Sequence, residues 1–384
     1  MTATIPTPKP GELLELAHVP FAAQALVLTR LAREQKRPLV HVGVQDKDCE
    51  ALAALCQFLA PEIPLYLLPA WDTLPYDRVS PSPQLQSQRL ATLSAMAQAK
   101  PGTPYIVLTT LNAATQMLPP KDMVEGANFS VRTGATLDRD ALLKFLTDNG
   151  YSRTGKVMEA GEYAVRGSLI DLFPAGAEVA IRIDLFGDEV ESLRSFDPLT
   201  QVSDATVPHF TLGPVSEVLL QADTIERFRT RYRELFGSVT KDDPLYESIS
   251  AGRPYPGMEH WLPLFYDRLG RLSDYAPEAM LCHDHRISAL HQDRWDTVMD
   301  YYGARQQHEK LKDAWVYHPV PPEKFFVDPE RLVLQWQHAP RLLLTPYAPT
   351  AGGVSLNILS SPQLHTKRPG DERHPGEVVQ DYLA

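Results

Sequence analysis

Apolar residues in the first third of the chain follow two alternating spacings. Apolar runs rich in branched side chains predict buried strands at residues 37–44, 64–69 and 104–111. Helical spacing of apolar side chains predicts helices at residues 17–32, 46–60 and 85–98. Strands that alternate with helices in this way indicate a parallel α/β sheet. A proline-rich loop, residues 69–83, follows the second strand, at the edge where open α/β sheets bind ligands, although a purely structural role fits it equally well.

The pattern changes near residue 126. A helix is predicted over residues 138–149, with Asp138 as its N-cap and Gly150 just beyond its end. Three runs with strand-like alternation follow it, at residues 163–174, 178–186 and 189–196. Turn residues at Gly176 and at Gly187-Asp188 separate these runs. We therefore expect a small antiparallel meander, in a second domain of a different class.

The central run of this meander has a clear period of two. One face receives apolar side chains only, from Val179, Ile181, Ile183 and Leu185. Arg182 and Phe186 point the other way, and Arg166 of the neighbouring run can join them. An outward phenylalanine beside an outward arginine is typical of a protein interface. The alternative is local: Phe186 folds over the Gly187 turn, and Arg182 pairs with Asp184.

The rest of the chain returns to a mixed α/β pattern. The strongest elements are a charged amphipathic helix at residues 222–237 and a buried strand at residues 279–286. Two further strands are expected after a hinge, at residues 340–347 and 353–359. The sequence ends with "GEVVQDYLA", a helix start with little to pack on. We therefore expect residues 353–384 to be an incomplete domain or tail of a longer protein.

Composition narrows the class of protein. The 384 residues suffice for two to four domains at ~100–200 residues each. The net charge of −11 disfavours a protein that coats nucleic acid. No apolar run approaches the length of a membrane helix, and the start of the chain does not resemble a secretion signal. The three cysteines, Cys49, Cys56 and Cys282, fit buried free thiols in a reducing cytoplasm. With no apolar seam left unassigned, we expect a monomer.

The stretch "GYSRTGKV" resembles a phosphate-binding P-loop in spelling. Gly150 is followed after four residues by Gly155-Lys156, but Val157 stands where Ser or Thr would bind magnesium. A P-loop also joins a strand to the start of a helix, whereas Gly150 ends a predicted helix. The match is therefore interpreted as accidental.

One group of residues has spacing compatible with a metal site: Cys282, His283, His285 and His291. Strand-end histidines in a chain with 12 histidines are the stronger interpretation. No nucleophile elbow or cysteine in a catalytic context is present in the sequence, so we expect neither catalytic nor metal-binding residues in this chain.

Three motifs carry a family resemblance: "WDTLPYDRVSPSPQLQSQRLATL", "GEYAVRGSLIDLFPAGAEVAIRIDLFGDEVESLRSFDPLTQVS" and "YPGMEHWLPLFYD". Together they resemble the amino-terminal module of bacterial transcription-repair coupling factors, a module similar to the excision-repair protein UvrB. The resemblance runs from about residue 10 to at least residue 350.

This resemblance implies a domain plan. A degenerate helicase-like α/β domain of the P-loop NTPase type, with a parallel sheet, would be formed by residues 1–125 and 211–335. A β-rich UvrA-binding domain would be inserted at residues 126–210. Residues 336–352 would be a linker to the next domain.

The resemblance also implies a function. The family's UvrA-facing residues fall on Arg166, Arg182 and Phe186, the residues that the strand pattern places outward or nearby. The chain would be a non-catalytic recruitment module that brings nucleotide excision repair to stalled RNA polymerase. Binding of polymerase and double-stranded DNA, and the ATP and magnesium of the translocase motor, would belong to absent parts of the parent protein.

Two rival functions remain open. A helicase-like ATPase would need nucleotide bound at "VPFAAQAL", which lacks the glycines and lysine of a P-loop, and a magnesium acid in "MLCHDH", where only Asp284 is present. A weak DNA-binding module could use basic pairs such as Lys367-Arg368.

Overall fold

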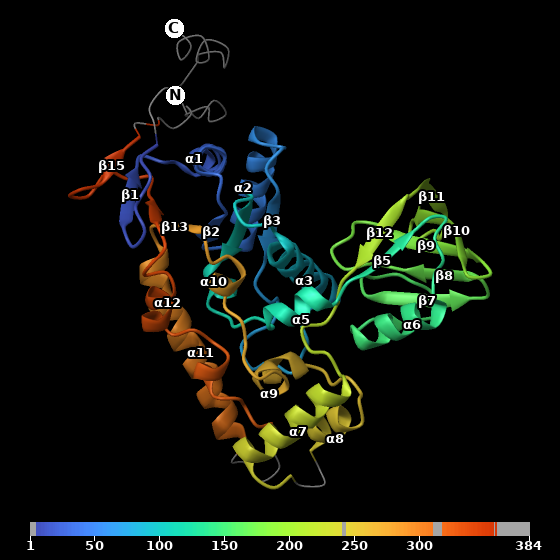
Figure 1. The fold of residues 1–384 in the computed structure, drawn as a ribbon. Coiled ribbons are helices and arrows are strands. Elements are labelled where there is room, and N and C mark those ends of the chain that lie inside the picture. Colours follow the sequence, from blue (N-terminus) through green and yellow to red (C-terminus); the bar gives the residue numbers. More distant parts are fainter. Residues whose placement is uncertain (1–4, 240–242, 310–316, 357, 359–384) are drawn as a thin grey trace, which may run out of the picture.

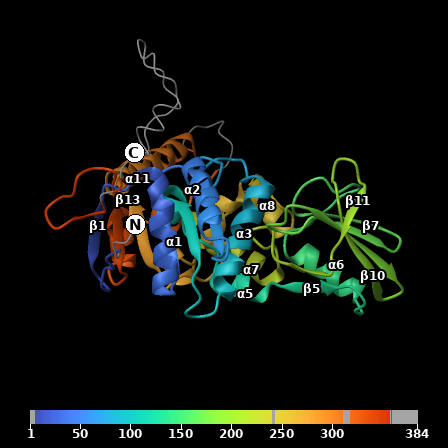
Figure 2. The same cartoon turned by 90° about the horizontal axis from the view of Figure 1, so that it is seen from above.

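A computed structural model describes residues 5–239, 243–309, 317–356 and 358. Its ribbon forms a larger α/β unit with a smaller β-rich unit at its side (Figure 1). A view turned by 90° shows the two units side by side, with α3 (Pro83–Gln98) on the side of the larger unit that faces the smaller one (Figure 2). The chain therefore has a mixed α/β fold consistent with a helicase-like domain that carries an additional β-rich unit.

The larger unit is built on a parallel sheet. Its strands follow the order β15-β1-β14-β13-β2-β4-β3, and every neighbouring pair is parallel. Their bounds are β1 Leu13–Ala17, β2 Leu39–Gly43, β3 Leu65–Leu68, β4 Ile106–Thr110, β13 Met280–Asp284, β14 Arg341–Leu344 and β15 Val354–Ser355. The central strands β2 and β4 are buried along their whole length, as expected for a sheet covered on both faces.

Helices cover both faces of this sheet. Helices α1 (Phe21–Gln35) and α2 (Asp46–Leu59) pack an aliphatic core on one face. Helix α3 covers the opposite face together with α4 Leu111–Ala114, α5 Lys121–Gly126, α10 Leu272–Tyr275, α11 Ile287–Glu309 and α12 Pro329–Gln335. All three cysteines are buried free thiols, as predicted. In the described parts of the chain, no helix is long and apolar enough to cross a membrane.

An aromatic core lies next to this sandwich. It is built by α7 Ala222–Phe236, α8 Pro244–Ser250, α9 Leu262–Phe265 and the short 3₁₀ helices η1 Met258–Trp261 and η2 Pro322–Lys324. Trp261 and Phe265 are buried at its centre. The loop at residues 69–82 contributes Trp71 and Tyr76 to the same core. The two sequence motifs that contain these residues are therefore packed together, although they lie far apart in the chain.

The smaller unit is a β-meander with one helix, in which β7 to β11 pair antiparallel and the short β6 pairs parallel to β7. Its sheet has the order β11-β10-β9-β8-β7-β6, and a separate ladder pairs β12 with β5. The bounds are β5 Phe129–Arg132, β6 Ser152–Arg153, β7 Glu162–Arg166, β8 Leu169–Leu172, β9 Ala180–Phe186, β10 Glu189–Phe196, β11 Ser203–Thr206 and β12 His209–Leu212. Helix α6 (Arg139–Asp148) packs Leu142 and Leu146 onto the sheet, and the Asp138 side chain caps it by accepting the Ala141 N–H, as predicted.

Several sequence-based expectations need correction. The run 163–174 is a hairpin rather than one strand, because Gly167 adopts φ +61° and turns the chain between β7 and β8. The strand predicted at residues 340–347 is present as β14, but it is not part of a linker: it lies between β1 and β13 in the large sheet. β15 pairs with β1 and so belongs to that sheet, whereas residues 357 and 359–384 of the expected last domain lie outside the described residues. The sequence pattern also missed β1.

Candidate protein-interaction surface

The inner face of the meander is set by the alternation along β9. Ile181, Ile183 and Leu185 are buried against α6 and its neighbouring strands, as the period of two predicts. Val179 was expected on this face but precedes the strand and is exposed. In the apolar core of this unit, side chains from β8, β9 and β10 lock the register of the meander. The side chains of alternate residues are thereby fixed on the outer face.

The outer face carries the predicted interface residues in two rows across the strands. Strand pairing places Leu169 opposite both Arg166 on β7 and Asp184 on β9. In the next row, Asp171 lies opposite Arg182. Phe186 ends β9, at the turn into β10. The three predicted residues therefore belong to one face of one sheet, although they come from different strands.

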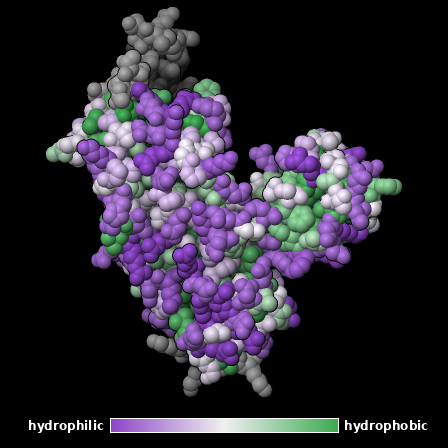
Figure 3. All heavy atoms as spheres, viewed as in Figure 1, coloured by the Kyte–Doolittle hydropathy of each residue, from purple (hydrophilic) through white to green (hydrophobic). Residues whose placement is uncertain are grey.

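Phe186 is the most exposed of the three. Its relative exposure is 77%, far above that of a core phenylalanine. Gly187 and Asp188 form the following turn, and Gly187 has φ +62°, so Phe186 stands at the tip of a tight hairpin. The local alternative, in which the ring folds over the turn, is wrong because a folded ring would be shielded. In the view of Figure 3, apolar residues gather on the small unit, over its strands.

Arg166 is also exposed, and a hydrogen bond to the backbone holds its side chain. One of its terminal nitrogens, Nη2, donates a hydrogen bond of 2.5 Å to the carbonyl oxygen of Gly155. This contact orients the side chain across the loop after β6 and leaves other guanidinium N–H groups on the exposed surface. Arg166 thus combines a fixed direction with free donors, which suits contact with a carboxylate.

Arg182 differs from the expectation of a solvent-facing residue. Its Nε and Nη2 donate to both carboxylate oxygens of Asp171, at 2.7 and 3.0 Å. Its Nη1 lies 3.3 Å from the carbonyl oxygen of Gln201, and the guanidinium carbon lies 4.9 Å from the centre of the Phe196 ring. The side chain is only 20% exposed, and its hydrogen bond to Asp171 raises the pKa of the arginine. Arg182 is therefore part of the sheet's own structure, with one edge at the surface.

The P-loop look-alike packs against the outer face of the meander and cannot bind phosphate as a P-loop does. Gly150 follows the end of α6, and Val157 is completely buried in a small apolar cluster. Lys156 extends to the carbonyl oxygen of Leu199, 3.2 Å away. No helix starts behind the lysine, so the phosphate-binding geometry is missing from this stretch.

The position where helicase-like NTPases carry a P-loop lies between β1 and α1. His18–Pro20 connects these two elements. The N–H of His18 donates to the carbonyl oxygen of Tyr347, and the N–H of Val19 donates to that of Thr345, both at 2.9 Å. Pro20 has no N–H to offer. The backbone donors that would hold a phosphate are thus bound to the segment after β14.

Of the remaining candidates, the acid Asp284 is paired locally and Cys282 is buried in the core. Asp284, the expected remnant of a magnesium site, accepts two hydrogen bonds from the Arg286 guanidinium, at 2.8 and 3.0 Å. Cys282 is fully buried in the aliphatic core, on β13, the strand that also carries Asp284. In residues 5–239, 243–309, 317–356 and 358, no group of three or more His, Cys, Asp or Glu side chains is arranged to hold a metal ion.

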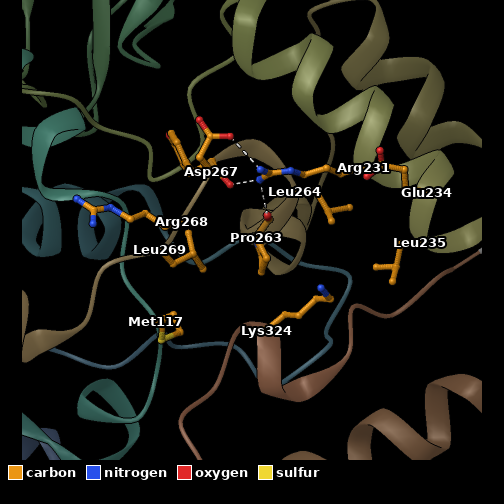
Figure 4. Close-up of a pocket in the computed structure, with 11 residues that line it drawn as sticks. Met117, Arg231, Glu234, Leu235, Pro263, Leu264, Asp267, Arg268, Leu269 and Lys324 are labelled. Carbon is orange, nitrogen blue, oxygen red and sulfur yellow. Dashed lines mark hydrogen bonds and ion pairs between the residues drawn. The ribbon is translucent and has the colours of Figure 1, made fainter. Parts of the chain in front are cut away.

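A surface hollow of about 550 Å³ lies between α7 and the segment 263–269. Figure 4 shows Arg231 turned toward Asp267 and the Pro263 carbonyl. The Arg231 Nη2 lies 2.9 Å from Asp267 Oδ1, so the charge of this cation is already compensated. The arrangement is that of a structural ion pair rather than of a catalytic group.

The small unit matches a known domain family. Residues 129–217, from the first residue of β5 to Glu217, match the UvrB interaction domain family.

Most of the chain has relatives of one kind. It is 32% identical over 339 residues to the transcription-repair-coupling factor of Haemophilus influenzae, which is 88% of this chain and 29% of that protein. The Escherichia coli transcription-repair-coupling factor is 29% identical over 386 residues, covering 99% of this chain and 32% of the relative. The protein described here is thus a homologue of transcription-repair-coupling factors over most of its length. It spans between 29% and 32% of the length of these two relatives.

Proposed function

We propose that this chain is a recruitment module of transcription-coupled DNA repair that binds UvrA through the outer face of β7–β9. The observation that carries the proposal is the exposure of Phe186, 77%, on a unit that matches the UvrB interaction domain family. A large apolar ring held at the tip of a rigid hairpin loses little conformational freedom when a partner covers it. Aromatic residues of this kind often supply much of the affinity of an interface.

The three residues would have different roles in binding. Phe186 would fill an apolar depression on the partner, and Arg166 would pair with a carboxylate there. Arg182 would act mainly through the sheet, because Asp171 and the Gln201 carbonyl already occupy its nitrogens. The matching surface of UvrA would combine an apolar pocket with acidic side chains.

We further propose that the chain hydrolyses no nucleotide. The loop His18–Pro20 has no glycine or lysine, and its two N–H groups donate to carbonyl oxygens of the protein. Asp284 is paired with Arg286 instead of facing an open site. Contact with RNA polymerase, and ATP-driven movement on double-stranded DNA, would belong to the remainder of a longer parent protein.

The test is calorimetric titration of this chain with purified UvrA, beside the variants Arg166→Ala and Phe186→Ala. We expect Phe186→Ala to weaken binding roughly 30-fold, or about 2 kcal/mol, and Arg166→Ala roughly tenfold. Phe58→Ala is the matched control, because Phe58 is a phenylalanine of similar exposure, 84%, on α2 of the larger unit. Arg139→Ala serves in the same way for arginine, since Arg139 is exposed on α6, behind the sheet.

The outcomes separate the proposal from its rivals. Binding that the controls retain and the two test variants lose would support recruitment through this face. No binding by the folded wild-type chain, or equal loss in test and control variants, would refute it. A thermal shift on addition of ATP and magnesium would favour a helicase-like ATPase, and salt-sensitive retardation of DNA would favour a DNA-binding module.

A further inference from the structure

A second group of exposed apolar side chains lies in the small unit. Leu199 and Val202, in the turn between β10 and β11, have exposures of 74% and 64%. Met158, in the loop between β6 and β7, is also exposed. We call these three residues the turn patch. Apolar side chains that gather on the surface of a folded unit often mark an interaction site, whereas a single exposed one needs no explanation.

Hydrogen bonds hold the loop and the turn of this patch against each other. The Lys156 Nζ donates to the carbonyl oxygen of Leu199, at 3.2 Å. The side-chain nitrogen of Gln201 donates to the carbonyl oxygen of Val157, at 3.0 Å. Val157 precedes Met158 and is completely buried against the outer face of the meander. The loop and the turn therefore form one surface, although they lie about 40 residues apart in the chain.

The turn is also held by its own hydrogen bonds. The Asp197 carboxylate accepts the N–H groups of Thr200 and Leu199, at 3.0 and 2.7 Å, and these hydrogen bonds lower the pKa of Asp197. The N–H of Gln201 donates to the carbonyl oxygen of Asp197 at 2.7 Å, and the N–H of Asp197 donates to that of Val202 at 3.1 Å. Side chains on a preformed turn lose little conformational freedom when a partner covers them, which favours binding.

The turn patch is continuous with the face that we propose for UvrA. The carbonyl oxygen of Gly155, the residue before Lys156, accepts a hydrogen bond from Arg166. On the side of the turn, the Gln201 carbonyl oxygen lies 3.3 Å from the Arg182 Nη1. Two of the three predicted interface residues therefore contact the segments that carry the turn patch.

The turn patch and Phe186 lie at opposite ends of this face. Phe196, just before the turn, pairs with Ala180, the first residue of β9, whereas Phe186 is the last. The seven residues of β9 span roughly 20 Å, at ~3.3 Å per residue. A standard interface covers about 800 Å² on each partner, which is roughly 30 Å across. One partner can therefore cover both ends together, with Arg166 and Arg182 between them.

We propose that the turn patch is a second anchor for UvrA, an inference that rests on the proposed function. The same UvrA molecule would cover both ends of the face, because hydrogen bonds join them and because both belong to residues 129–217, which match the UvrB interaction domain family. The partner would then carry two apolar depressions roughly 20 Å apart. Carboxylates between these depressions would face Arg166 and the exposed Lys156.

The experiment adds three variants to the titration of the whole chain with purified UvrA: Leu199→Ala, Val202→Ala and the double variant Phe186→Ala/Leu199→Ala. We expect roughly tenfold weaker binding in Leu199→Ala and roughly threefold in Val202→Ala, because the smaller side chain buries less apolar area. Distant sites act independently, so the double variant should bind roughly 300-fold more weakly. Leu334→Ala and Val333→Ala are the matched controls, because these residues of α12 in the larger unit have exposures of 57% and 59%.

The outcomes distinguish this proposal from the proposed function. If Phe186→Ala weakens binding but folded Leu199→Ala and Val202→Ala variants bind as the wild type does, the turn patch is not an anchor and the proposed function stands. No binding by the folded wild-type chain overturns both. If sedimentation shows a dimer of the wild type that Leu199→Ala dissociates, a second copy covers the turn patch and the proposal is also overturned. If Leu199→Ala fails to fold, Val202→Ala alone decides.

Discussion

Replacing Arg182 with alanine should destabilise the small unit as well as alter its surface. The guanidinium makes a bidentate ion pair with Asp171, whose exposure is 3%. Arg182→Ala would leave that carboxylate buried without its charged partner. It would also remove the guanidinium from the face of the Phe196 ring, 4.9 Å away.

The magnitude follows from these two losses. Breaking a fully buried ion pair costs about 3–5 kcal/mol, but Arg182 retains 20% exposure, so the lower end or less applies. The contact with the Phe196 ring adds roughly 0.5–1 kcal/mol. We therefore expect a loss of about 2–3 kcal/mol in the stability of the meander. The double variant Asp171→Ala/Arg182→Ala should lose less stability than the sum of the losses in the two single variants, because it leaves no unpaired charge in the sheet.

Hydrogen exchange measured by mass spectrometry gives a readout for this unit alone. A loss of about 2–3 kcal/mol corresponds to roughly 30- to 150-fold faster exchange of the protected amides in β8 and β9. Tryptophan fluorescence is the internal control, because none of the five tryptophans lies in residues 129–217, and it should report an unchanged larger unit. Unchanged exchange in β8 and β9 of Arg182→Ala would refute the reasoning and would mean that water solvates Asp171 adequately.

Two buried acids of the larger unit give further predictions. Glu217→Ala should lower the free energy of unfolding, measured in urea, by about 3–5 kcal/mol, because Arg89 and Glu217 form a fully buried ion pair, 2.5 Å apart. The substitution should also shift the fluorescence of Trp71, because Glu217 accepts the hydrogen bond of its indole N–H. Unchanged stability would contradict the inferred role of that pair. Burial raises the pKa of Glu259 from 4.5 to about 7. Between these pH values the native state keeps a proton that the unfolded state releases, so the stability of the wild type falls as the pH rises. Relative to Glu259→Gln, the wild type should lose up to about 3 kcal/mol between pH 5 and pH 8, and parallel pH profiles would exclude this.

The sequence allowed the outer face of the meander to be predicted because strand alternation is a local property. A period of two needs only consecutive residues, so Ile183 and Phe186 could be assigned to opposite faces directly. The N-cap at Asp138 was predictable for the same reason, since the cap bonds an N–H only three residues away.

The pairing of strands that lie far apart in the sequence could not be predicted from the local pattern of apolar residues. β1 is short, begins with exposed Leu13 and is held by β14, more than 300 residues later. The strand at residues 340–347 was predicted, but its place between β1 and β13 was not, and so it was assigned to a linker. The partner of Arg182 was sought at Asp184, its neighbour on the same face, whereas the strand register places Asp171 directly opposite. Register between two strands depends on the segment that joins them, here residues 173–179 between β8 and β9, and the alternation along a single strand does not fix it.

The measurement that tests the central claim most directly is a hydrogen-exchange footprint of this chain in complex with UvrA. The account predicts slower exchange in the hairpin loops and strand ends around Arg166 and Phe186, and no change in α1 and α2 of the larger unit. Protection confined to the larger unit, or to the inner side of the meander at α6, would contradict it.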